Sequence, residues 1–268
     1  MKTIELVFFP GGKEKAVTLS YDDGTIHDRR LVQILNTYGL KGSFHLNSGN
    51  LGRPGYLCPE EVRDLFQGHE ISAHTVTHPG LSYMPPESVA WEILEDRRRL
   101  EALAGYPVRG MSYPYGSFDP ALAARLPHYG IEYARTVQSH GKFHIPENFL
   151  QWHPTCHHRE NLLERATQYV NLPRRRRLSI FYVWGHSIEF ERNQNWDLIE
   201  RFAETVAKAA DSIWFATNIE IVDYLNALKQ IRQSVDGTLV QNFSHLPVWA
   251  LISGEVKVIP PGGLLDLR

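Results

Sequence analysis

Short apolar runs alternate with longer amphipathic segments along most of this chain. The short runs are rich in β-branched and aromatic residues, which is typical of strands. The longer segments repeat apolar residues every three or four positions, as helices do. Alternation of these two patterns predicts βα units built around a largely parallel sheet. The predicted strands span residues 16–21, 43–46, 70–73, 110–113, 131–134, 179–184 and 212–215.

The amphipathic segments predict the intervening helices. The longest, 85–103, begins at a Pro-Pro-Glu sequence and places Val89, Ile93 and Leu100 on one apolar face. Its charged residues, among them Glu92 and Asp96, are expected on the solvent side. The other predicted helices span 28–38, 59–68, 195–208 and 219–230, and one more begins after Asp119.

About seven βα units result from this count, one fewer than in an eight-fold barrel. We therefore predict an α/β fold, a distorted (β/α)7-type barrel, over residues 1–236. The last stretch, 237–268, changes character, because strand-like runs are separated there by Ser-Gly and Pro-Pro-Gly-Gly turns. It predicts a small C-terminal β appendage. Whether the appendage covers a sheet edge, binds a ligand or joins copies into a homo-oligomer stays open.

Composition excludes several classes of partner. Lys and Arg number 28 against 30 Asp and Glu, a formal net charge of −2, so no overall field favours nucleic acid or an anionic membrane surface. No run approaches the roughly 20 apolar residues of a membrane helix. The N-terminal apolar run is interrupted by Glu5 and is too short for a signal peptide. We expect a cytoplasmic protein whose partner is a small molecule or an oligosaccharide.

Polar residues with catalytic or ligating side chains recur just beyond the predicted strands. Asp22 and Asp23 follow the first strand, His74 and His78 the third, and His186 the clearest buried strand. In a parallel barrel the carboxyl ends of the strands gather at one mouth, so these groups should meet. Each motif alone is ordinary. Together, two histidines and a carboxylate predict a metal site with three protein ligands and one open position, which is hydrolytic in type.

Four motifs give the chain a resemblance to a known family. They are Tyr21-Asp22-Asp23-Gly24, the segment 68–78 that ends in His74-Thr75-Val76-Thr77-His78, Pro114-Tyr115-Gly116, and Trp184-Gly185-His186. In these motifs the chain resembles the polysaccharide deacetylases, carbohydrate esterase family 4, over about residues 16–186. The family fold is a distorted barrel of βα units, in agreement with the count made from the pattern alone.

The resemblance implies a role for each matching residue. Asp23, His74 and His78 would hold a divalent metal, zinc in the first place, with Co²⁺, Ni²⁺ or Mn²⁺ as alternatives. Asp22 would be the general base, the backbone N–H of Tyr115 the oxyanion donor, and His186 the general acid. Adjacent carboxylates in a regular strand face opposite ways, so Gly24 must let the chain bend if both are to reach one site.

The chain departs from the family at one pair of positions. The third motif normally carries an Arg three residues before its Tyr, and Ser112 stands there. The fourth motif, read at 150–154, has Gln151 where an Asp is expected. Absence of both partners of an ion pair is a coherent variant, because loss of one alone would leave an unpaired charge. Arg109 is one candidate to replace the missing Arg.

A histidine-rich segment, 139–158, supplies further candidates. Trp152, His157 and His158 are candidate substrate-binding residues; the alternative for Trp152 is a place in the core, and for the two histidines an ordinary surface loop. His45 is expected to be structural. Glu189, three residues after His186, either orients that histidine or lies in a solvated loop.

These observations predict an enzyme. The expected reaction is metal-dependent removal of an acyl group, acetyl above all, from nitrogen on a carbohydrate or related small molecule. Ester substrates would use the same base, metal and oxyanion site, so the motifs do not separate the two. The competing hypothesis is a carbohydrate-binding protein that keeps the metal but catalyses weakly or not at all, because Ser112 replaces the family Arg.

Overall fold

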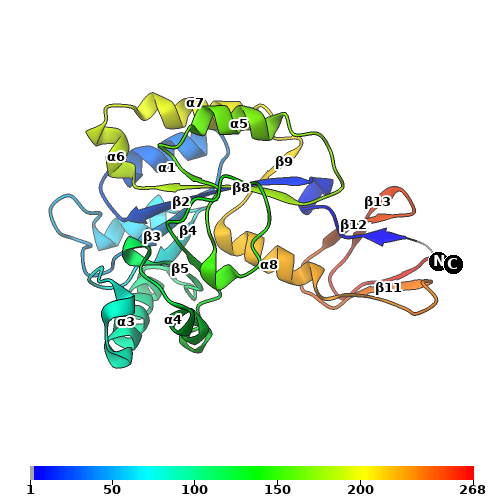
Figure 1. Cartoon of the computed structure of the whole chain (residues 1–268), viewed down its shortest axis with the longest axis horizontal. Coiled ribbons are helices and arrows are strands. Elements are labelled where there is room, and N and C mark those ends of the chain that lie inside the picture. Colours follow the sequence, from blue (N-terminus) through cyan, green and yellow to red (C-terminus); the bar gives the residue numbers. More distant parts are fainter. Residues whose placement is uncertain (1–2) are drawn as a thin grey trace.

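A curled parallel sheet forms the centre of the computed structural model, which describes residues 3–268 (Figure 1). Its strand order is β6-β5-β4-β3-β2-β8-β7, and β9 pairs with the first half of β2. The bounds are β2 Lys15–Asp23, β3 Ser43–Leu46, β4 Glu70–Ala73, β5 Gly110–Ser112, β6 Tyr133–Arg135, β7 Cys156–His157, β8 Ser179–Gly185 and β9 Ile213–Phe215.

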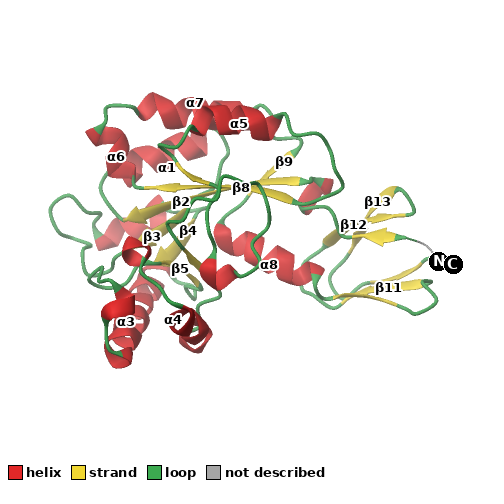
Figure 2. Cartoon of the chain, in the orientation of Figure 1, coloured by secondary structure: helices red, strands yellow, loops and turns green. Residues whose placement is uncertain are grey.

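Helices pack in two groups around the outside of this curled sheet (Figure 2). One group, α1, α5, α6 and α7, packs along β2 and β8, whereas α3 and α4 lie beyond β4 and β5 (Figure 1). Helical apolar faces and strand side chains such as Leu19, Phe44 and Ile71 form one buried core. The bounds are α1 Asp28–Thr37, α2 Val62–Leu65, α3 Pro86–Ala104, α4 Pro120–Arg125, α5 Leu162–Val170, α6 Ser187–Arg192, α7 Trp196–Ala207 and α8 Asn218–Leu228.

Segment 150–157 narrows the gap between the two edges of the sheet. Trp152 donates its N–H to the carbonyl of Ala134 and accepts from the N–H of Thr136, on the β6 side. Thr155 then donates to the carbonyl of Tyr182 on β8. Buried backbone groups at both edges are thereby satisfied, and the sheet curls towards a barrel.

Helix α8 begins beneath the sheet, at the amino-terminal ends of its strands. Thr217 and Glu220 form a capping box there. The buried amide of Asn218 accepts from the Thr18 hydroxyl at 2.7 Å and donates to the Tyr182 hydroxyl at 2.6 Å. Polar residues of the barrel interior therefore find their partners on the helix that covers them.

The β appendage consists of two three-stranded antiparallel sheets in the described part of the chain, β1-β12-β13 and β10-β11-β14. Two of the strands, β1 and β10, come from before residue 237, so the appendage joins both ends of the chain (Figure 1). It lies at the amino-terminal ends of the barrel strands, where Val248 packs into a core that includes Ile180 and Tyr224. The bounds are β1 Ile4–Glu5, β10 Ile231–Gln233, β11 Leu239–Asn242, β12 Val248–Ile252, β13 Glu255–Ile259 and β14 Leu264–Asp266.

The predicted α/β barrel fold is confirmed, and each of the seven predicted strands is present in the sheet. The pattern missed α5, α6 and the two-residue strand β7; of these, α6 and β7 are too short to show a clear periodicity. The expected solvent side of α3 is wrong in part, since Glu92 and Asp96 are buried. In residues 3–268 no helix is long and apolar enough to cross a membrane.

Candidate active site

The two adjacent carboxylates lie at the carboxyl end of β2, where the strand leaves the sheet. Asp23 has φ 84° and Gly24 φ 69°, so the chain turns at both residues rather than at the glycine alone. The turn brings both carboxylates to the barrel mouth, with Asp22 2% exposed and Asp23 half-buried. A side chain at Gly24 would also be crowded, because a Cβ there would lie 3.1 Å from a methyl of Leu46.

Backbone strain is concentrated around this turn. Besides Asp23, the non-glycine residues Thr75, His78 and Tyr115 adopt positive φ values of 69°, 60° and 57°. Such conformations cost of order 1–3 kcal/mol each and persist only where the surroundings fix them, most often at functional sites. Their grouping at one end of the sheet is therefore independent support for a site there.

Three ligating side chains converge on one point. The Nε2 atoms of His74 and His78 each lie 3.7 Å from Oδ1 of Asp23. Nδ1 of His74 is 2.9 Å from the carbonyl oxygen of Ser112, which can only accept a hydrogen bond. That bond places the proton of the neutral ring on Nδ1 and leaves the Nε2 lone pair facing Asp23. The donor set and tautomer fit a divalent cation such as zinc.

Helix α3 holds the loop that bears the histidines. Asp96 accepts hydrogen bonds from the backbone N–H groups of His74 at 3.0 Å and Ser48 at 2.8 Å. One turn earlier, Glu92 accepts from the backbone N–H of Thr77 at 2.9 Å and from its hydroxyl at 2.5 Å. Burial raises the pKa of Asp96 to about 7. Glu92 and Asp96 therefore stabilise the loop that bears the histidines and do not face solvent.

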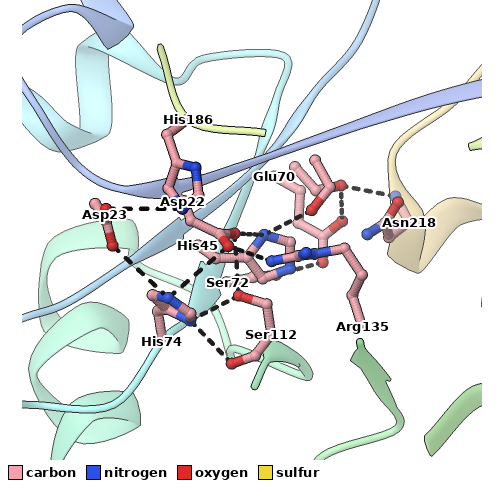
Figure 3. A network of polar contacts seen from close by, with 12 residues as sticks. Asp22, Asp23, His45, Glu70, Ser72, His74, Ser112, Arg135, His186 and Asn218 are labelled. Atoms are coloured by element: carbon pink, nitrogen blue, oxygen red, sulfur yellow. Dashed lines mark hydrogen bonds and ion pairs between the residues drawn. The ribbon is translucent and has the colours of Figure 1, made fainter. Parts of the chain in front are cut away.

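Arg135, the last residue of β6, supplies the arginine that the third motif lacks. Its guanidinium is fully buried and forms an ion pair with Oδ2 of Asp22 (Figure 3). The hydroxyl of Ser112 donates to the other oxygen, Oδ1, at 3.1 Å. The guanidinium also lies over the Trp184 ring, 4.3 Å from its centroid. Arg109, the replacement considered from sequence, instead bonds Glu132 and Asp223 away from the site.

The surroundings of Asp22 keep it ionised. Burial alone would raise the pKa of this carboxyl, but the Arg135 guanidinium lowers it well below its usual range. His45 lies with Nδ1 3.6 Å from Oδ1 of Asp22, and burial lowers its pKa to about 3. His45 is therefore a neutral neighbour of the base and not its counter-ion.

His186 faces the carboxylates from the end of β8. Its Nε2 lies 4.0 Å from Oδ2 of Asp23, and its Nδ1 lies 3.2 Å from Oε1 of Glu189. Burial opposes protonation of His186, but Glu189, Asp22 and Asp23 outweigh it and raise its pKa. Of the two alternatives for Glu189, the structure favours orientation of the histidine, since this side chain is 12% exposed.

A second polar cluster lies deeper in the barrel, next to His45 (Figure 3). The carboxylate of Glu70 accepts hydrogen bonds from the hydroxyls of Ser43, Ser72 and Tyr133, each at 2.7 Å. Burial raises the pKa of Glu70. The same Tyr133 hydroxyl is 3.4 Å from Nε2 of His45, so the base at the mouth and the buried Glu70 share one polar interior.

The structure places the other residues predicted for the site in different surroundings. Trp152 is 2% exposed and packs against Tyr133 and Tyr182, so its ring belongs to the core and is not offered to a substrate. His157 and His158 do reach the site region, but they are buried beside Glu189. The Tyr115 side chain is 74% exposed, with its ring 4.4 Å from that of His78.

Sequence reasoning missed Arg135, although a usable signal was present. Arg135 directly follows the predicted strand 131–134, at the same end of the sheet as Asp22, His74 and His186. The rule that collected those residues from strand ends would have collected the arginine as well. Glu92 and Asp96 gave no such signal, because a charged pair on a helix is ordinarily solvated.

Known proteins are similar in sequence to the amino-terminal half of this chain. Residues 10–134 match the family model described as polysaccharide deacetylase. Over 113 residues the chain is 31% identical to the putative polysaccharide deacetylase YheN of Bacillus subtilis, covering 41% of this chain and 39% of that protein. Over 115 residues it is 26% identical to the peptidoglycan-N-acetylglucosamine deacetylase PgdA of Listeria monocytogenes, covering 42% of this chain and 24% of the relative. The match is thus less than half of either relative.

Solved structures share the fold over more of the chain. A putative polysaccharide deacetylase from Mycobacterium smegmatis has a TM-score of 0.62 at 18% identity, covering 84% of this chain and 94% of the other. A family 4 acetyl xylan esterase from Clostridium thermocellum, in complex with a cobalt ion, has a TM-score of 0.53 at 18% identity, covering 77% and 89%.

Fold and site together define an α/β barrel protein with paired carboxylates and paired histidines at the carboxyl ends of its strands. Over residues 10–134, a little under half of the chain, the sequence matches the polysaccharide deacetylase family.

Proposed function

We propose that the chain is a metal-dependent deacetylase that hydrolyses the acetamide group of an N-acetylated carbohydrate. The main support for this proposal is that a candidate metal-ligand set, a carboxylate base and a histidine acid lie next to one another. Asp23, His74 and His78 form a ligand set, and Asp22 and His186 stand beside it. Among the relatives, PgdA is named for the N-acetylglucosamine of peptidoglycan, which supports an amide substrate.

The ligand set fits a divalent cation, with zinc as the first candidate. When bound, such a cation supplies Lewis acidity, which lowers the pKa of water from 15.7 towards about 7 and polarises a carbonyl oxygen. Asp23, His74 and His78 would hold it by one oxygen and two imidazole nitrogens. Three protein ligands leave a position open for substrate or solvent, as in hydrolytic sites.

The chain's own groups account for the proton transfers. Asp22, kept ionised by Arg135, accepts a proton from the attacking water. The backbone N–H of Tyr115, fixed by the strained turn at that residue, donates to the oxyanion that develops on the carbonyl oxygen. An amine leaves only when protonated, and His186, whose pKa is raised, delivers that proton through Nε2.

Arg135 weakens the competing hypothesis of a binding protein without efficient catalysis. That hypothesis rested on the absence of an arginine to hold Asp22, and the guanidinium of Arg135 fills this role from β6. Ester hydrolysis remains an alternative reaction at the same site. Action in the cytoplasm, and on an oligosaccharide in preference to a polymer, are further parts of the proposal.

Three variants test the proposal together with the unaltered protein. Bound metal is measured by elemental analysis, and acetate release is measured on N-acetylated glucosamine oligosaccharides and on acetylated xylan. We expect one metal ion per chain and acetate release, loss of metal in His74→Ala, and metal without acetate release in Asp22→Asn. Tyr83→Ala, an exposed ring outside the proposed set, should behave like the unaltered protein. Full acetate release by Asp22→Asn would overturn the proposal.

A further inference from the structure

We propose that His157 and His158 are positioning residues, which fix the carboxylate of Glu189 and, through it, the orientation of His186. The inference rests on the proposed function in one respect, that His186 is the proton donor. It assigns a role to two buried histidines that sequence reasoning placed among substrate contacts.

One carboxylate meets three imidazoles in this cluster. Nε2 of His158 lies 2.9 Å and Nε2 of His157 3.3 Å from Oε2 of Glu189. The other oxygen, Oε1, lies 3.2 Å from Nδ1 of His186. An ionised carboxylate can only accept, so each facing nitrogen must carry a proton for the contact to be favourable. Oε2 of Glu189 is thus enclosed by two imidazole nitrogens at ion-pair distance, without an aligned hydrogen bond to either, and Oε1 faces His186.

The tautomer of His157 is fixed by a separate contact. The backbone N–H of Arg159 donates to Nδ1 of His157 at 3.2 Å, so Nδ1 has no proton. Burial lowers the pKa of His157 to about 3, so the ring is neutral and its one proton is on Nε2. The nitrogen that bears this proton is the one 3.3 Å from Oε2 of Glu189. The backbone around His157 therefore leaves the protonated nitrogen of the ring on the side of the carboxylate.

Packing prevents His158 from moving away. Its ring is 1% exposed and stacks on Phe190 with centroids 4.2 Å apart. On the opposite side it lies against the backbone of Gly185, where a Cβ would be 2.1 Å from Nδ1 of His158. A glycine directly before His186 is thus what makes room for the buried imidazole.

A second cation site is the competing interpretation, because His157, His158 and Glu189 also have converging ligand atoms. Two contacts disfavour it. A histidine that binds a metal through Nε2 ordinarily donates from Nδ1, whereas Nδ1 of His157 accepts. The guanidinium of Arg159 already lies 3.4 Å from Oε2 of Glu189, so a divalent ion would add to a local positive charge. The cluster is therefore better described as cationic and imidazole groups packed around the Glu189 carboxylate.

The tautomers can be read directly. In protein labelled with ¹⁵N-histidine, long-range ¹H–¹⁵N spectra distinguish the two neutral forms of each ring, with resonances assigned by single His→Gln variants. We expect His157 and His158 in the Nε2–H form and a proton on Nδ1 of His186. A proton on Nδ1 of neutral His157 would overturn the inference. This readout does not depend on turnover, so it stands apart from any failure of the proposed activity.

Paired variants add a functional readout. His158→Gln keeps an amide donor near the position of Nε2, whereas His158→Leu and Gly185→Ala remove or displace it. We expect kcat to fall roughly 10-fold in the last two, the scale of one hydrogen bond to a charged group, with KM and metal content unchanged, and to recover in part in His158→Gln. His128→Ala, an exposed histidine, is the control. Two metal ions per chain, reduced to one in both His158 variants, would instead establish the cation site.

Discussion

Arg135 and Asp22 form a buried ion pair although they belong to strands that are not neighbours, β6 and β2. The guanidinium reaches the carboxylate because Ser112, on β5, one of the three strands between β6 and β2, has a small side chain and bonds the other oxygen of Asp22. The position at which the third motif normally has an arginine therefore holds the hydroxyl of Ser112, and the positive charge comes from the next strand, β6. The base keeps two fixed contacts, one to each oxygen.

Removal of this charge should affect both stability and rate. In Arg135→Ala the carboxylate of Asp22 stays buried without its counter-ion, which costs about 3–5 kcal/mol in comparable pairs. We expect a lower free energy of unfolding in urea and a kcat reduced about 10–100-fold, with the pKa of Asp22 raised. Arg135→Lys should recover part of the stability, since an ammonium restores the charge but not the planar geometry.

An arginine moved from β6 to β5 tests whether Asp22 needs only a positive charge or needs it from the position of Arg135. The double variant Ser112→Arg with Arg135→Ala places a guanidinium on the strand next to β4 and should regain activity relative to Arg135→Ala alone. The comparison is made on kcat and on the urea midpoint. If the double variant is no more active than the single one, the guanidinium is required specifically from β6.

Retention of metal should depend on Glu92, which touches no ligand atom. Glu92→Ala removes both hydrogen bonds to Thr77 and loosens the loop between the two histidines. We expect metal affinity to fall about 10-fold or more, measured by competition with a chromophoric chelator. Glu95→Ala on the same helix is the matched control, because its ion pairs with Arg98 and Arg99 are at the surface and contribute little. Equal losses in both variants would contradict a specific role for Glu92.

Asp28 should make stability fall as pH rises. Burial raises the pKa of this carboxyl to about 8, against an opposing effect of the Ser187 hydroxyl, whereas in the unfolded chain it is near 3.9. Between these values the folded state binds the proton and the unfolded state does not, so stability is lost as pH rises from about 4 to about 8.

Asp28→Asn removes that dependence. The variant should be more stable than the unaltered protein at pH 8, by several kcal/mol, because each pH unit between the two pKa values contributes about 1.4 kcal/mol, and nearly equal to it at pH 4. Urea unfolding at the two pH values measures the difference, and the exposed Asp64→Asn is the control. A constant offset at both pH values would mean that Asp28 does not change its protonation in this range.

Metal should stabilise the fold through the proposed ligand set. Zinc at about 100 times its dissociation constant adds about 2.7 kcal/mol, or roughly 5–10 °C in Tm for a domain of this size. We expect this shift in scanning calorimetry, its reversal by a chelator, and its absence in His78→Ala. His245→Ala, an exposed histidine in the appendage, should keep the full shift. A shift that survives in His78→Ala would place the metal elsewhere.

Local pattern was sufficient for the barrel because its strands are continuous apolar runs and its helices are amphipathic. The same reasoning failed for Glu92 and Asp96, because a charge on a helix face is indistinguishable in sequence whether it meets solvent or a buried loop. It failed for Trp152 because a large ring suits a core as well as a sugar. The division of the chain at residues 236 and 237 stays a prediction, although β1 and β10 pair with strands beyond it.

The sequence by itself determined which chemical groups stand at the carboxyl ends of the strands, because strand period and turn residues are local properties. Asp22, Asp23, His74, His78 and His186 were placed in this way. Only the tertiary structure decided what holds them, since the contact between Arg135 and Asp22 joins residues far apart in the chain. It depends on how the sheet curls and on which side chain leaves room between two strands. No periodicity in the sequence records that geometry.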